Sequence, residues 1–112
     1  MSEYHVLRFG GTLDIGRLEE FSDTFKSVPA GAPVLVDLTR VEAVDSVFLS
    51  EMLLFRRRHR GKVVVVIPPS GNVARVFDLA DIGAKVNVYA DLERAHRELD
   101  SQGDAQTDEP LV

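Results

Sequence analysis

An aspartate and a serine side by side, Asp45 and Ser46, form the pair in this sequence whose types and position could support chemistry. They stand directly before residues 47–60, a helix-favouring stretch without Gly or Pro, and both residue types cap helix starts. A phosphate on Ser46 would face the free N–H groups of that helix, yet would add about −1.5 to −2 charge beside Asp45. Ser46 is therefore a candidate phosphoacceptor whose modification would repel a partner, and a plain helix cap is the alternative.

Two large apolar residues, Val47 and Phe48, follow this pair at once. The apolar positions of residues 47–60 spread too widely around a helix to form a single stripe. Because a helix on a small one-sheet domain normally buries one side, we expect an exposed apolar patch near Val47 and Phe48 that contacts a partner. Full burial of both side chains is the alternative.

The residues that enzymes and metal sites use most are scarce in this chain. It has no cysteine, and its 3 histidines, at positions 5, 59 and 96, lack metal-ligand spacing. Serine-elbow, Walker and Gly-x-Gly-x-x-Gly motifs are also missing from the sequence. We therefore predict a protein that is not an enzyme, with no catalytic residues, no metal and no cofactor. Ser70 and Gly71 before a helix leave a small-molecule or nucleotide binder as a minor alternative.

Length and charge point to one small acidic domain. The 112 residues carry a formal net charge of −5, which disfavours direct binding of nucleic acid. We interpret the basic run at residues 56–60 as a solvated helix end, with an acidic partner or anionic lipid as the alternative. No apolar run is long enough to span a membrane, so we expect a soluble, cytoplasmic protein of unspecified oligomeric state.

Strand-like and helix-like segments alternate along the chain. The strand-like segments are residues 4–9, 34–38, 62–67 and 86–89. The helix-like segments are residues 18–28 after a cap at Asp14, 47–60, 73–80, and 92–99 after a cap at Asp91. This β-α-β-α-β-α-β-α order predicts an α/β domain over residues 1–100, with a single four-stranded mixed β-sheet and about four helices packed on it. Residues 101–112 are predicted to form an acidic flexible C-terminal tail.

Four short motifs follow one another along the chain. They are Gly11-Thr12-Leu13-Asp14, residues 34–38, Val44-Asp45-Ser46 and residues 72–82. In this order they resemble a STAS domain, the type found in bacterial anti-sigma factor antagonists and in sulfate transporter tails. The resemblance covers about residues 4–99 of the chain.

The resemblance implies an anti-sigma factor antagonist, also called an anti-anti-sigma factor, that acts in transcription regulation and stress signalling. Such a protein binds an anti-sigma factor that is also a serine kinase of the histidine-kinase-like ATPase fold. Phosphorylation ends that binding, and a phosphatase restores it. Carried over by position, Ser46 is the phosphoacceptor, and the partner-binding residues are Asp14, Asp45, Ser46, Val47 and Phe48.

This chain departs from the family pattern directly after Ser46. Where the family has Ser then Gly, the chain has Val47 and Phe48. The departure supports an alternative function as a non-phosphorylated docking or scaffold subunit of a transport ATPase, as in lipid trafficking, or of a signalling assembly. In that case Val47 and Phe48 form the contact and Ser46 is only a cap.

Overall fold

A single parallel sheet forms the centre of the molecule. The computed structural model describes the backbone of residues 4–108 and the side chains of residues 4–100. The strands are β1 (His5–Leu13), β2 (Val34–Val44), β3 (Val63–Val66) and β4 (Asn87–Tyr89), in the order β1-β2-β3-β4. The α-helices are α1 (Leu18–Lys26), α2 (Ser46–Arg58), α3 (Asn72–Leu79) and α4 (Leu92–Asp108). Two 3-10 turns, η1 (Ile15–Arg17) and η2 (Ile82–Ala84), lie before α1 and after α3.

The expected element order is confirmed, but the expectation of a mixed sheet is wrong. All three strand pairs among the described residues are parallel. Each strand is joined to the next by a helical crossover, and such a connection returns the chain in the same direction beside the strand it left. The four valines of β3 are all buried, as expected for a strand inside a parallel sheet with both faces covered.

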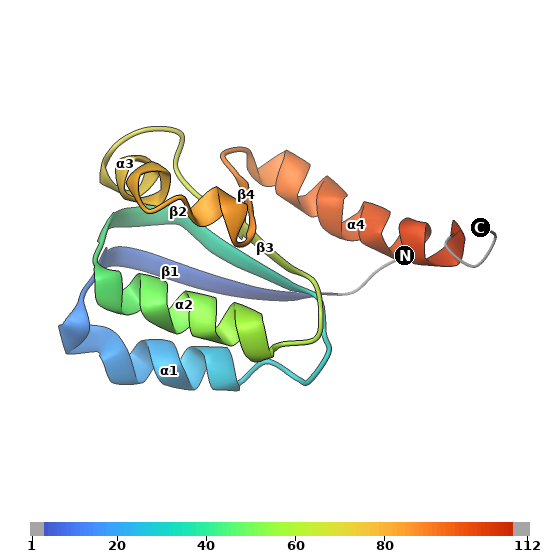
Figure 1. Cartoon of the computed structure of the whole chain (residues 1–112), viewed down its shortest axis with the longest axis horizontal. Helices are drawn as coiled ribbons and strands as arrows, with labels where there is room; N and C mark the ends of the chain where they lie inside the picture. The colour runs from blue at the N-terminus through green and yellow to red at the C-terminus, as the bar shows by residue number, and fades with distance from the viewer. Residues whose placement is uncertain (1–3, 109–112) are drawn as a thin grey trace.

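The two faces of the sheet are covered unequally (Figure 1). One face packs against α1, α2 and α3 and holds the larger core, which includes six phenylalanines, Phe9, Phe21, Phe25, Phe48, Phe55 and Phe77. On the other face, Ala95 and Leu99 of α4 pack with Leu35, Val64 and Val66 in a smaller cluster. The helices that follow β1, β2 and β3 therefore all lie on the more heavily packed face.

Strands β1 and β2 run several residues further than their sequence patterns predict. The first strand was predicted over residues 4–9, but β1 continues through Gly10 and Gly11, which form an irregular stretch within it, and Gly11 adopts a φ of 73°. The Arg17 guanidinium supports this stretch by donating to the carbonyls of Gly10 (2.6 Å) and Thr12 (3.1 Å). The extension brings Leu13 opposite Val44 and so aligns the ends of the two strands.

The last helix is longer than its apolar stripe predicts. The backbone of α4 stays helical to Asp108, whereas the expected stripe ended at Leu99. The side chains from residue 101 onward, and residues 109–112 entirely, lie outside the described residues, so the acidic flexible tail stays a prediction. Within the part of the chain that the structure describes, no helix is long and apolar enough to span a membrane.

Candidate functional site

The carboxyl edge of the sheet brings together three helical starts (Figure 1). The Asp45 N–H donates to the Leu13 carbonyl (3.2 Å), which joins the end of β2 to the end of β1. The Val44 N–H donates to the side-chain oxygen of Asn72 (3.1 Å), the first residue of α3. Residues 14, 45–46 and 72 therefore meet at one edge. Sequence reasoning included Asn72 in a family motif but assigned it no role, and this contact supplies one.

Two aspartates cap the helical segments that begin here. The Asp14 carboxylate accepts from the Gly16 N–H (3.0 Å) at the start of η1. The Asp45 carboxylate accepts from the N–H groups of Val47 (3.0 Å) and Phe48 (3.2 Å) at the start of α2. The predicted cap at Asp45 is confirmed, whereas Asp14 caps the 3-10 turn η1 that precedes α1 and not α1 itself. Each carboxylate is fixed by backbone donors that have no partner inside the helix itself.

Ser46 is the first residue of α2 and does not cap it. Its side chain is exposed and forms no hydrogen bond with any residue that the structure describes. Asp45 has taken the capping role that the simpler interpretation gave to Ser46, so that interpretation is wrong. The Ser46 hydroxyl is open to another protein, beside a fixed carboxylate and above the positive end of a helix.

The expectation of an exposed Phe48 is wrong. Its side chain has 0% exposure and meets the rings of Phe9 (centroid distance 5.3 Å) and Phe21 (5.0 Å) edge-on. The reason is that α2 packs against the sheet on one side and against α1 on another, so its wide apolar surface is buried. Val47 is half-buried. Any direct contact that a partner makes beside Ser46 therefore involves Val47 and not the Phe48 ring.

An ion pair braces the turn that carries Asp14. Arg17 contacts Glu20 through two hydrogen bonds (2.9 and 2.7 Å), while the same guanidinium holds the β1 carbonyls. The hydrogen bonds from Arg17 hold the pKa of Glu20 below its usual range. Arg17 thus links the end of β1 to the start of α1 and fixes the path of the chain through Asp14. Sequence reasoning missed this residue, because a lone arginine in a helix start has no pattern of its own.

The chemistry available at this edge is that of a binding surface. Besides the Arg17–Glu20 ion pair, two capping carboxylates, Asp14 and Asp45, lie at this edge. The Ser46 hydroxyl is exposed beside them, and no described residue is hydrogen-bonded to it as a base. Within the described residues, no group of three or more His, Asp or Glu side chains is placed to hold a metal ion. The edge is suited to accepting a phosphoryl group from another protein or to docking against one.

Comparison with protein families identifies one match over most of the chain. A family model described as "Mlab, STAS domain" matches residues 2–93. No curated protein matches the chain.

Solved structures share the fold at low sequence identity. An anti-sigma factor antagonist from Mycobacterium paratuberculosis is 21% identical, with a TM-score of 0.71 over 88% of this chain and 91% of that chain. A candidate anti-sigma factor antagonist from Thermotoga maritima is 22% identical, with a TM-score of 0.68 over 84% of this chain and 85% of that one. The STAS domain of a SulP transporter from Vibrio cholerae is 22% identical, with a TM-score of 0.71 over 92% of this chain and 85% of that one. At these identities the likeness shows a common fold.

Proposed function

Because the chain belongs to the STAS domain family described as "Mlab, STAS domain", we propose that it is a protein-binding module switched by phosphorylation of Ser46, in the manner of an anti-sigma factor antagonist. The proposed partner is an anti-sigma factor that is also a serine kinase of the histidine-kinase-like ATPase fold. Unmodified chain binds this partner and releases the sigma factor. The module acts in the cytoplasm, where the kinase uses ATP, and it performs no catalysis itself.

One observation supports this proposal above the others: the Ser46 hydroxyl is exposed at the first residue of α2 while Asp45 caps the helix. A kinase can reach the hydroxyl without breaking a hydrogen bond of the fold. In the transfer, the Ser46 oxygen bonds to the γ-phosphorus of ATP, the bond to the β-phosphate oxygen breaks, ADP leaves and the hydroxyl proton is released. A phosphatase reverses the change by hydrolysis.

The electrostatics of the edge explain why a phosphate would end binding without unfolding the domain. The α2 N-terminus favours a negative group, so the helix tolerates the phosphate. The added charge of about −1.5 to −2 stands beside Asp45, on a surface that also presents Asp14. A partner surface that fits two carboxylates and a neutral hydroxyl then meets a much more negative patch. The partner contact in this proposal is formed by Asp14, Asp45, Ser46 and Val47, with Phe48 supporting it from the core.

The experiment is phosphorylation by purified kinases. The chain is incubated with ATP and each histidine-kinase-like anti-sigma factor of its own genome, and intact mass is followed for one added phosphate. The Ser46→Ala variant should gain no phosphate. Ser50→Ala is the matched control, because Ser50 is a second exposed serine on the same helix, and this variant should still gain one phosphate. Absence of phosphate with every kinase, or a phosphate that persists in Ser46→Ala, contradicts the switch.

A second candidate is a docking subunit that is not phosphorylated. It is favoured by the family match and by the half-buried Val47, which stands where the motif of the antagonists has a small residue. The likeness to a SulP transporter STAS domain agrees with a role beside a transport system. Here the chain binds a transport ATPase constitutively through the same edge. A stable complex with such an ATPase, unchanged by Ser46→Asp, would decide for this candidate.

A further inference from the structure

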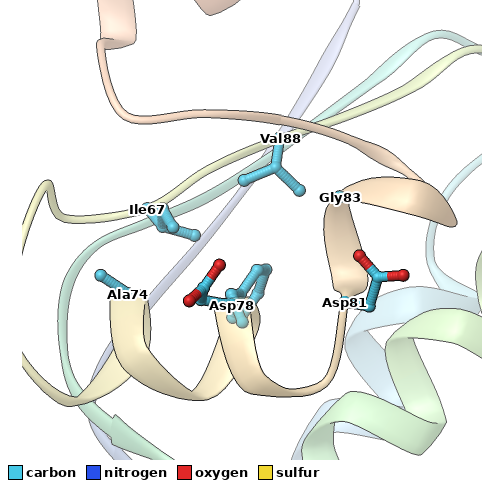
Figure 2. Close-up of a pocket in the computed structure, with 7 residues that line it drawn as sticks. Ile67, Ala74, Asp78, Asp81, Gly83 and Val88 are labelled. Carbon is cyan, nitrogen blue, oxygen red and sulfur yellow. The ribbon is translucent and has the colours of Figure 1, made fainter.

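A second concave surface lies at the other end of α3, away from Ser46. Four apolar side chains, Ile67, Ala74, Phe77 and Val88, form its floor, and Asp78, Asp81 and Gly83 complete its wall. The cavity has a volume of about 280 Å³. Figure 2 shows Val88 of β4 and Ile67, the residue directly after β3, pointing toward α3, with the Asp78 carboxylate rising from the helix toward them. We call this hollow the α3 pocket.

The charge around the α3 pocket is opposite to what the helix alone would favour. The last turns of α1 and α2 carry basic residues, Lys26 and Arg56 to Arg58, which complement the negative end of a helix. The last turn of α3 has no basic residue and contains Asp78, and Asp81 follows it two residues after the helix. Carboxylates at this end of a helix cost some stability, so the rim of the α3 pocket carries negative charge that its own helix does not favour.

No side chain of the described residues pairs directly with these carboxylates. Neither Asp78 nor Asp81 forms an ion pair or a side-chain hydrogen bond within that part of the chain. Two cations lie close in sequence: Arg75 forms no ion pair with either carboxylate, and Lys85 donates to the Ala80 carbonyl (3.2 Å). Asp81 also adopts a left-handed backbone conformation, with φ of 54°, at the turn into η2.

We propose that the α3 pocket docks an arginine from an amphipathic, basic segment of a protein partner. The methylene stem of arginine packs on apolar surface while its guanidinium reaches the rim, where it pairs with carboxylates. Apolar neighbours on the same segment pack on the rest of the floor, beside Ile67 and Val88. This surface is separate from Ser46 and does not depend on the phosphorylation switch.

The first test uses a defined peptide probe and the intact chain. An acetylated, amidated helical peptide with leucines and one central arginine is titrated while backbone amide shifts are recorded by NMR. We expect shifts at Ala74, Asp78 and Gly83. The matched peptide with citrulline, which has the same shape without charge, should bind at least about tenfold more weakly, and so should the Asp78→Asn/Asp81→Asn variant. Equal binding of both peptides, shifts confined to other residues, or no shift at millimolar peptide would overturn the proposal.

The second test measures the cost of the unsatisfied charge in the free protein. Asp78→Asn/Asp81→Asn should raise the melting temperature by about 2–5 °C, because it removes negative charge from a helix C-terminus. Glu93→Gln is the control, and it should lower the melting temperature. Glu93 lies in the first turn of α4, where a negative charge stabilises the helix. An unchanged or lowered melting temperature for the aspartate variant would contradict the charge argument. Self-association that the same variant abolishes would show that a second copy, and not another protein, occupies the pocket.

Discussion

Replacing Phe48 with alanine tests the description of the site most directly. The sequence analysis predicted that this side chain lies on the partner surface, whereas the structure places it in the core. The ring has no exposed area and packs against Phe9, Phe21 and Phe25, at centroid distances of 5.3, 5.0 and 6.1 Å. Removing a buried phenyl group costs about 3–5 kcal/mol, from lost burial and from the cavity left behind. A domain of this size has a total unfolding free energy of about 5–15 kcal/mol, so Phe48→Ala should be severely destabilised.

The assay is urea unfolding followed by circular dichroism, with partner binding measured on the folded fraction. Phe48→Leu serves as the milder variant, which retains part of the apolar volume and keeps the protein folded for the binding assay. Val47→Ala is the matched surface variant. It should lose at most about 1 kcal/mol of stability while weakening the partner complex.

Two results would refute this reasoning. A loss below about 1 kcal/mol for Phe48→Ala would mean that the ring is not part of the core. A folded Phe48→Leu variant with native stability and a large loss of partner affinity would mean that the ring is the contact, as the sequence analysis expected.

Three further predictions concern the same edge and the packing of α4. Ser46→Asp should weaken the complex with the kinase partner at least about tenfold, whereas Ser46→Ala should bind like the native chain, and equal affinities by calorimetry would exclude charge control at this position. Asp45→Ala should lower the unfolding free energy by about 0.5–2 kcal/mol because two N–H groups of α2 lose their acceptor, and Asp45→Asn should restore most of it. Lys62 holds Glu98 at 2.8 Å and lowers the pKa of that carboxyl. The ion pair therefore contributes stability above the ordinary glutamate pKa and loses it as the pH falls through the lowered pKa. Urea unfolding at about pH 7 and about pH 3 should show a smaller acid-induced loss for Glu98→Gln than for the native chain, and equal losses would contradict the linkage.

Local residue types predicted most of the elements and the cap at Asp45. An aspartate directly before an apolar, glycine-free stretch indicated the start of α2, and Asp45 caps it. The unbroken valine run lies within the predicted strand at residues 62–67, and an uninterrupted apolar run is typical of a strand buried on both faces, as β3 is. These features depend on a few neighbouring residues, so the sequence alone was sufficient for them.

The errors concern features that depend on distant parts of the chain. Whether Phe48 is exposed depends on where α1 lies, and α1 closes over the side of α2 that was expected to be free. Whether Gly10 and Gly11 end a strand depends on the length of β2, which continues to Val44 and keeps β1 paired. The direction of each strand depends on how the helices cross the sheet, and the parallel result follows from those crossovers.

The brace formed by Arg17 also bears on how the protein behaves at high concentration. Strand β1 lies at the edge of the sheet, and an open edge is a template on which a strand of another molecule can pair and start an aggregate. Arg17 occupies the carbonyls of Gly10 and Thr12, and the irregular stretch at the glycines disrupts the regular spacing that a neighbouring strand would need. The side chain that fixes the path through Asp14 thus also removes part of the edge from intermolecular pairing. Under the proposed function, in which the carboxyl edge stays exposed until a partner binds, the same contact protects the chain against unwanted assembly.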